Sequence, residues 1–296
     1  MLPKRLVFAG GGTRCLVFLQ SLIDLEAHGT LKNVNEYWGT SAGSLLASLY
    51  ALTKSATTVK RLMKSVDYSK FRDIDIGNLV NINSTWGLDD GKSLIGQIEI
   101  LFEAIEPGSK SKCMRDVEGL HIVVSDLNDR ESLVLHSGNY PDLRIVEAVR
   151  ASMSLPVFLK PYIHTKSGHY WVDGGVRHNF PWELLPNDAA RDEALGFAFS
   201  KFGGSLRTFN EYMFSMVHFD EPKKLKQFSQ KWKHNILWHT TPPFPAWFTN
   251  LREDDYVLID SIGRSVAQEW IKRDKTVIQT LDQESSAGRP GRRWSI

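Results

Sequence analysis

Short apolar runs alternate with amphipathic stretches along the first two thirds of the chain. The apolar runs predict strands at residues 5–9, 34–38, 120–125, 132–137, 169–172 and 194–200. The amphipathic stretches predict helices at residues 15–28, 44–52, 57–66, 93–105 and 142–151. Strands that alternate with helices are typical of an α/β fold, in which helices cover both faces of a mostly parallel sheet.

The pattern is less regular elsewhere. Residues 54–115 predict an excursion outside the sheet, which is either a lid or substrate wall beside a site or a helical pair packed on the sheet. Residues 206–248 are predicted to be helical to irregular. A last strand is expected at residues 257–262 and a final helix at residues 264–281.

A serine stands in a glycine turn after the second predicted strand. Gly39, Ser41 and Gly43 form the motif Gly-x-Ser-x-Gly, and a helix is predicted to begin directly behind it. Strand, turn and helix are the context in which this motif presents a nucleophilic serine, because glycines leave room for the sharp turn. The helix N-terminus would direct its amides, that of Ala42 first, at an oxyanion. The alternative is a plain Gly/Ser turn.

Three further glycines, Gly10, Gly11 and Gly12, follow the first predicted strand and precede a helix. A dinucleotide site would require a glycine in place of Cys15 and an acidic residue after the next strand. A phosphate-binding Walker loop would require a Gly-Lys-Ser/Thr ending, which is absent. An oxyanion hole requires only glycine amides close to Ser41. Adjacent parallel strands would place both loops on one edge of the sheet, so the pattern favours an oxyanion hole.

These motifs, with three later ones, resemble those of the patatin-like phospholipase family. The blocks are Gly-Gly-Gly-Thr-Arg at 10–14, Gly-Thr-Ser-Ala-Gly at 39–43, a weaker Gly-Leu-Asp-Asp-Gly at 87–91, Ala-Ser-Met-Ser-Leu-Pro at 151–156, and Asp-Gly-Gly at 173–175 with Asn179 and Pro181 behind it. All occur in the family's order, over residues 5–186. One position departs from the family, which usually has glycine where Cys15 stands.

The resemblance implies a three-layer α/β/α sandwich and a lipid acyl hydrolase that cleaves carboxylic esters of phospholipids or related lipids. It implies a Ser-Asp dyad, with Ser41 as nucleophile, Asp173 as base and no histidine. The amides of the glycine loop and of Ala42 would hold the oxyanion. The motif residues that support these groups are Arg14, Gly39, Gly43, Gly174 and Gly175.

The residues themselves add to this picture. The apolar residues before Asp173 should bury its carboxyl group and raise its basicity, although alone it would be interpreted as a turn aspartate. Asp89 and Asp90 are predicted to lie in a solvated turn. Arg14 either binds an anionic head group or braces the glycine loop, and we favour bracing.

Two other functions compete with the dyad. Cys15 makes a catalytically weak lipid-binding or regulatory protein on the same fold conceivable. A Ser-Asp-His triad could use His218, His234 or His239, but in α/β-hydrolases the elbow follows several strands rather than the second one.

No His, Cys, Asp or Glu cluster has metal-ligand spacing, so we expect no metal and no other cofactor. His164 and His169 are interpreted as isolated surface histidines.

Composition places the chain among soluble globular proteins, with 42% hydrophobic and 24% charged residues. Without a repeat or a clear linker, we expect one domain at residues 5–284, with the motif-bearing core at 5–186 and an extension at 187–284. The tail 285–296 is basic and predicted to be disordered.

Charge and cysteine content bear on partners and compartment. A net charge of +2 argues against a nucleic-acid partner, and two cysteines predict no disulfide framework. No apolar run has the length of a membrane span, and the first residues do not form a signal peptide. We therefore expect an intracellular, cytoplasmic protein.

The segment from Lys223 to Phe248 interleaves lysines with tryptophan and phenylalanine. Such a composition predicts peripheral contact with an anionic membrane surface. The alternative is an amphipathic helix with solvated lysines and buried aromatic rings.

Overall fold

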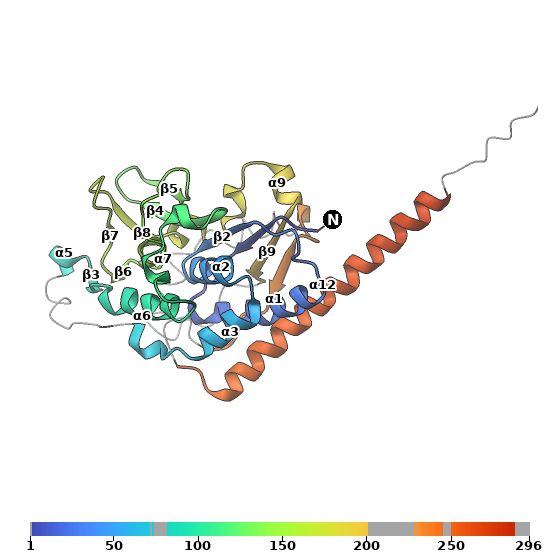
Figure 1. The fold of residues 1–296 in the computed structure, drawn as a ribbon, viewed down its shortest axis with the longest axis horizontal. Helices are drawn as coiled ribbons and strands as arrows, with labels where there is room; N and C mark the ends of the chain where they lie inside the picture. Colours follow the sequence, from blue (N-terminus) through green and yellow to red (C-terminus); the bar gives the residue numbers. More distant parts are fainter. Residues whose placement is uncertain are drawn as a thin grey trace, which may run out of the picture.

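A central, mostly parallel sheet organises the fold (Figure 1). The computed structural model describes residues 2–71, 73, 82–200, 228, 230–244 and 250–287, with side chains of the last helix described as far as Arg273. The strands of this sheet are β1 (Arg5–Phe8), β2 (Glu36–Thr40), β4 (Leu120–Asp126), β5 (Glu131–Leu135), β7 (Tyr162–Ile163), β8 (Tyr170–Asp173), β9 (Ala194–Phe199) and β10 (Ile236–His239).

The strand order is β10-β9-β1-β2-β4-β8-β7, and β5 pairs with β4 as well. Neighbours from β10 to β4 are parallel, whereas β5 and β8 run antiparallel to β4, and β7 runs antiparallel to β8. The predicted hairpin at residues 120–137 is therefore confirmed.

Helices flank the sheet, as Figure 1 shows, and the predicted α/β fold is confirmed. Their bounds are α1 (Val17–Ala27), α2 (Ala42–Thr53), α3 (Ala56–Lys64), α5 (Ile82–Thr85), α6 (Lys92–Glu103), α7 (Ile145–Ser152), α8 (Gly175–His178), α9 (Asp188–Asp192) and α12 (Glu253–Ala287). Short 3-10 turns, η1 (Gly12–Leu16) and η2 (Tyr68–Phe71), precede α1 and follow α3. Among the helices that the structure describes, none combines the length and apolar character needed to cross a membrane.

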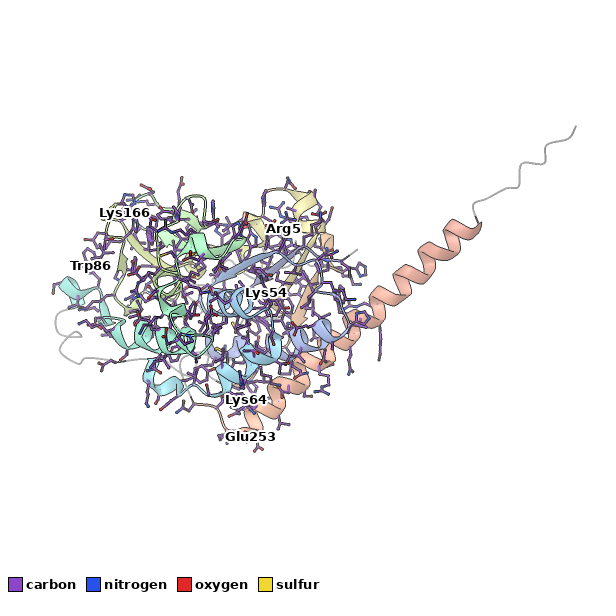
Figure 2. The ribbon with its side chains drawn as sticks, viewed as in Figure 1. Arg5, Lys54, Lys64, Trp86, Lys166 and Glu253 are labelled. Atoms are coloured by element: carbon purple, nitrogen blue, oxygen red, sulfur yellow. The ribbon has the colours of Figure 1, made fainter. Side chains whose placement is uncertain are left out.

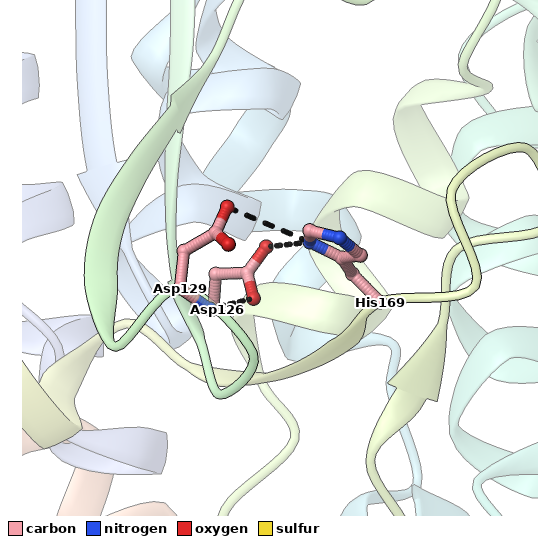
Figure 3. A group of neighbouring side chains, drawn as sticks. All are labelled: Asp126, Asp129 and His169. Carbon is pink, nitrogen blue, oxygen red and sulfur yellow. Dashed lines mark hydrogen bonds and ion pairs between the residues drawn. The ribbon is translucent and has the colours of Figure 1, made fainter.

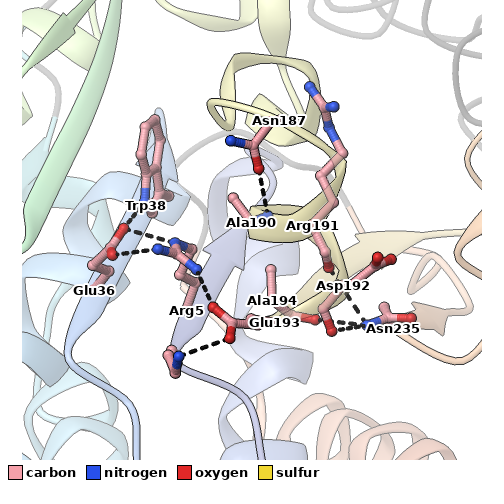
Figure 4. A network of polar contacts seen from close by, with 11 residues as sticks. Arg5, Glu36, Trp38, Asn187, Ala190, Arg191, Asp192, Glu193, Ala194 and Asn235 are labelled. Atoms are coloured by element: carbon pink, nitrogen blue, oxygen red, sulfur yellow. Dashed lines mark hydrogen bonds and ion pairs between the residues drawn. The ribbon is translucent and has the colours of Figure 1, made fainter.

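Charged residues hold the strands together at the end opposite the glycine turns (Figure 4). The guanidinium of Arg5, at the start of β1, pairs with Glu36 of β2 at 2.8 Å and with Glu193, just before β9, at 3.1 Å. Because the Arg5 side chain is only 16% exposed, these pairs are better shielded from water than ordinary surface pairs. They fix β1 between its two neighbours.

The expected last strand at residues 257–262 is wrong, because α12 runs unbroken through it. Its buried residues are Ile259, Gly263, Ala267 and Trp270, spaced by three or four as in a helix. Val257 is 63% exposed, which breaks the alternation that a half-buried strand would show. The helical period thus prevails over the β-favouring run of residues.

Two strand pairings were not predicted. β10 lies within the segment expected to be helical to irregular, and it pairs with β9 through four residues. β3 (Gly87–Asp89) lies inside the excursion and pairs in parallel with β6 (Val157–Leu159) in a separate two-stranded sheet. Both runs are too short for their periodicity to be recognised in the sequence.

In the segment from Lys223 to Phe248, most of the described aromatic rings are buried, and Trp238 is partly exposed. Phe228, Trp232 and Phe244 are buried, each less than a tenth exposed. The expectation that these rings contact a membrane is therefore wrong, because they pack into the core. Lys223 to Lys226 and Trp247 to Phe248 lie outside the described residues.

The tail 285–296 was predicted to be disordered. Residues 285–287 form the end of α12 instead, and residues 288–296 lie outside the described residues.

Candidate active site

The sheet register brings Ser41 and Asp173 together. Thr40, the last residue of β2, pairs with Val123 of β4, and Asp173, the last residue of β8, pairs with the next residue, Val124. The chain leaves both strands at the same point. There Ser41 Oγ donates a hydrogen bond to Asp173 Oδ2 at 2.7 Å.

The backbone at Ser41 is strained, with φ 53° and ψ −129°. A non-glycine residue with positive φ costs of the order of 1 kcal/mol or more, and such residues occur at functional sites. Gly39 and Gly43 allow the turn, because a Cβ atom on Gly39 would collide with the Gly43 carbonyl and one on Gly43 with the Ala9 carbonyl. The predicted strand, sharp turn and helix are thus present around Ser41.

Asp173 lies in a buried position, only 3% exposed. Burial raises the pKa of its carboxyl group to about 7, against the lowering effect of hydrogen bonds from Ser41 and from the Gly175 amide. The Gly175 N–H donates to Oδ1 at 2.7 Å, so each carboxyl oxygen has one donor. A carboxyl group with this pKa can accept or release a proton near neutral pH.

The glycine loop offers amide donors beside Ser41. Gly10 is not one of them, because its N–H donates to the Asn179 carbonyl at 2.9 Å. Within the described part of the chain, the amides of Gly11, Gly12 and Ala42 have no acceptor. Free amides at the start of η1 and of α2 are donors that an oxyanion could use.

Ser152, to which the sequence motifs assigned no role, supports both reacting groups. Its buried Oγ accepts the Ser41 N–H at 2.9 Å and donates to the Val123 carbonyl at 2.6 Å. Its carbonyl accepts the Gly174 N–H at 3.3 Å, and the Ser154 carbonyl accepts the Asp173 N–H at 2.9 Å. The only signal in the sequence was its place in the Ala-Ser block.

Asn179 supports the glycine loop in a similar way. In addition to the backbone bond with Gly10, its Nδ2 donates to the Gly10 carbonyl at 3.2 Å. Thr40 Oγ1 donates to the neighbouring His178 carbonyl at 2.9 Å. The segment that begins at Asp173 therefore also holds the glycine loop and the end of β2.

Cys15 and Arg14 both have structural partners. The Cys15 thiol is buried and donates to the Ala9 carbonyl at 3.4 Å, and burial raises its pKa strongly, so it is neutral. Arg14 Nε donates to the Phe244 carbonyl at 2.8 Å, which fits bracing rather than exposure to a head group.

The three late histidines do not complete a triad in the described structure. His239 is fully buried, and its Nε2 contacts Ser21 Oγ at 2.8 Å rather than Ser41 or Asp173. His234 is exposed, and its carbonyl accepts the Trp270 indole N–H. His218 lies outside the described residues.

The expectation of a solvated turn at Asp89 is wrong. Asp89 ends β3, is 2% exposed, and accepts hydrogen bonds from the Gly91 and Asp73 amides. Asp90 next to it is partly exposed and pairs with Lys92 at 2.6 Å.

The histidines at residues 164 and 169 are not isolated. His164 is buried and stacks on Trp171 at 4.4 Å. His169 joins Asp126 and Asp129 in a group whose ligand atoms lie within 4.8 Å of one another, a cluster that sequence spacing did not reveal (Figure 3). His169 Nδ1 bonds Asp126 Oδ2 at 2.8 Å, which raises the pKa of His169.

Partners within the chain account for this group. Asp126 Oδ1 accepts the amides of Asn128 and Asp129, and Oδ2 also accepts the Trp171 indole N–H at 3.0 Å. An ion pair at a tight turn explains these contacts fully.

Residues 6–186 match the family described as patatin-like phospholipase. The uncharacterized protein R571 of Acanthamoeba polyphaga mimivirus is 22% identical over 241 residues, which cover 77% of this chain and 80% of R571. YqhO of Bacillus subtilis is 30% identical over 203 residues, or 62% of this chain and 67% of YqhO. Human patatin-like phospholipase domain-containing protein 6 is 26% identical over 191 residues, which are 63% of this chain but 12% of that protein.

Solved structures show the same fold. VipD from Legionella pneumophila superposes with a TM-score of 0.61 at 18% identity, over 92% of this chain and 67% of VipD. The type III effector protein ExoU superposes with a TM-score of 0.50 at 15% identity, over 92% of this chain and 53% of ExoU. Since the family match spans well over half of the 296 residues, this chain belongs to the patatin-like phospholipase family.

Proposed function

We propose that this protein is a serine acyl hydrolase that cleaves carboxylic esters of phospholipids or related lipids with Ser41 and Asp173. The observation that carries the proposal is the direct 2.7 Å hydrogen bond from Ser41 Oγ to Asp173 Oδ2. A serine hydroxyl is a poor nucleophile unless a neighbouring base takes its proton. Asp173, with its pKa raised to about 7, is suited to that role near neutral pH.

The first half of the reaction forms an acyl-enzyme. Ser41 Oγ attacks the ester carbonyl carbon while Asp173 takes the hydroxyl proton. The carbonyl oxygen becomes an oxyanion, which the amides of Gly11, Gly12 and Ala42 bind. Asp173 then donates its proton to the departing alcohol oxygen as the ester C–O bond breaks.

The second half releases the acid. Asp173, ionised again, takes a proton from a water molecule as that water attacks the acyl-enzyme carbonyl. The same three amides bind the second oxyanion, and the proton returns to Ser41 Oγ as the acyl bond breaks. Water is the second substrate, and the proton that it gives up ends on Ser41 Oγ.

Hydrolysis of p-nitrophenyl butyrate by the full chain tests this proposal. Ser41→Ala should reduce the rate to background, while Ser48→Ala, in the helix that begins directly after Ser41, should retain it. Ser48 is a matched control because, among the residues that the structure describes, its buried Oγ bonds only the Ser44 carbonyl in its own helix. Full activity in Ser41→Ala would overturn the mechanism. A wild-type chain that binds lipid without hydrolysing any ester would favour the lipid-binding alternative.

A further inference from the structure

A buried arginine directly precedes the Ala-Ser block that supports the site. Arg150 belongs to α7 and is only 5% exposed. A guanidinium is charged and has five N–H donors, so its burial is costly unless the donors find acceptors. Desolvation lowers the pKa of Arg150, and the nearby Asp89 carboxylate opposes that shift. The proposed reaction does not use Arg150, so its burial requires another explanation.

The guanidinium binds acceptors from three segments of the chain. Nη1 donates to Ser154 Oγ, and Nη2 donates to the carbonyls of Asp90 and Lys160, each at 3.0 Å. Asp90 directly follows β3 and Lys160 directly follows β6, so Arg150 joins the small two-stranded sheet to α7. This sheet lies at one end of the molecule beside α6 and α7 (Figure 1), where the exposed Trp86 precedes β3 (Figure 2).

Ser154 connects this arginine to the proposed base. Its buried hydroxyl accepts from Arg150 Nη1 and donates to the Arg150 carbonyl at 2.9 Å. Its own carbonyl accepts the Asp173 N–H at 2.9 Å. The position of Ser154 therefore helps to set the backbone of Asp173, whose carboxyl group accepts the hydrogen bond of Ser41.

The Gly-Leu-Asp-Asp-Gly block at 87–91 fits around the guanidinium. Asp89 Oδ1 accepts the Gly91 N–H at 2.7 Å, and Oδ2 accepts the Asp73 N–H. Gly91 has φ 77°, and a Cβ atom there would collide with the Arg150 guanidinium. The block thus binds Arg150 through the Asp90 carbonyl and leaves room for it at Gly91. This part of the excursion at residues 54–115 packs against residues that support the site.

We propose that Arg150 is a positioning residue for Asp173 and that the Gly-Leu-Asp-Asp-Gly block serves to hold it. The inference rests on the proposed function, because it concerns the geometry of the base. Proton transfer from Ser41 requires the Asp173 carboxyl group to stay within hydrogen-bonding distance. A displacement of about 1 Å can reduce a rate by about 10²-fold. Without the guanidinium, Ser154 Oγ and two carbonyls would lose their buried donor, and the backbone beside Asp173 would shift.

The test compares kcat and KM for p-nitrophenyl butyrate in the full chain and its variants. Arg150→Met keeps the length of the side chain but removes the donors, and should lower kcat by about 10²-fold with a smaller change in KM. Arg150→Lys keeps the charge without the planar fork, and should recover part of that loss. Ser154→Ala should lower kcat by about tenfold, and should add little to the loss in Arg150→Met, because both changes remove one contact.

The matched control is Arg191→Met. The Arg191 guanidinium also donates to main-chain carbonyls, those of Trp182, Glu183 and Leu185. In the part of the chain that the structure describes, it has no hydrogen bond to Asp173 or to the serines that support it. Arg191→Met should lower Tm but keep kcat near the wild-type value.

The outcomes separate this inference from the proposed function. Wild-type hydrolysis with kcat unchanged in Arg150→Met and Ser154→Ala would overturn the inference and leave the proposed function standing. The same loss of kcat in Arg150→Met and Arg191→Met would also overturn the inference. No hydrolysis by the wild type would overturn the proposed function itself. If Arg150→Met does not fold, Arg150→Lys takes its place in the comparison with Ser154→Ala, and fully additive losses in kcat would overturn the inference.

Discussion

Asp173 has a carboxyl group on which burial and hydrogen bonding act in opposite directions. Burial dominates and raises its pKa to about 7, so the base form increases as pH rises through neutrality. We expect kcat/KM for a soluble ester to rise with pH through about 7. Asp173→Asn keeps the shape but cannot accept the proton, and should reduce kcat by about 10²- to 10⁴-fold. A pH–rate profile of both proteins checks this, and an Asn variant that keeps the same ascending limb would contradict it.

The raised pKa of Asp173 also makes the free energy of unfolding depend on pH. The folded pKa of Asp173 is about 7, whereas its ordinary value is 3.8, so the folded state binds more protons between these values. The contribution of Asp173 to the free energy of unfolding therefore decreases as pH rises through this window. Asp173→Asn lacks this effect, and its Tm relative to wild type should increase from about pH 4 to about pH 8. Thermal unfolding followed by circular dichroism measures the difference in Tm between the two proteins. A difference that does not change with pH would contradict the raised pKa of Asp173.

Ser152 is expected to act as a positioning residue for Ser41. In Ser152→Ala the Ser41 amide and the Val123 carbonyl lose their buried partner, so the elbow should relax. We expect kcat to fall by about tenfold or more with a smaller change in KM, and Ser152→Thr to restore part of it.

The matched control is Ser125→Ala. Ser125 is equally buried, and its Oγ has no hydrogen-bond partner among the described residues. If the two alanine variants lost the same activity, Ser152 would have no special role.

At the scale of elements, α12 depends on close contact with α1. A Cβ atom on Gly263 would lie 2.5 Å from the Val17 carbonyl, so Gly263→Ala should separate the helices and lower Tm. Gly96 in α6 is the opposite case, with no atom within 4 Å of an added Cβ. Gly96→Ala should stabilise the protein by about 0.5–1 kcal/mol. Urea unfolding of both variants measures their free energies of unfolding. A Gly263→Ala variant as stable as the wild type would contradict the close packing of α12 on α1.

Elements with a clear hydrophobic pattern could be predicted from the sequence. Short elements, and elements in which two patterns conflict, could not. The strands that lead to Ser41 and Asp173 were correctly placed because short buried strands have continuous apolar runs bounded by glycines. The start of α12 was misassigned because a β-favouring run covers a helical spacing of buried residues. The strands β3 and β10 are short, and tertiary pairing rather than local pattern determines them.

At the scale of the whole molecule, the pairing of β4 with both β2 and β8 creates the site. Sequence motifs predicted that Ser41 and Asp173 belong together, but the register that joins them depends on contacts between distant residues. The occupied Gly10 amide, the role of Ser152 and the Asp126–His169 pair are likewise products of folding. Apart from the place of Ser152 in the Ala-Ser block, none of them has a local signature in the chain.

The most direct test of the central claim is the site of covalent labelling by a fluorophosphonate. This reagent reacts with a serine that a neighbouring base activates. After labelling of the full chain, intact mass and peptide mapping should show one adduct, located on Ser41, and inactivation should follow its formation. An adduct on another serine, or continued hydrolysis with Ser41 fully labelled, would contradict the account.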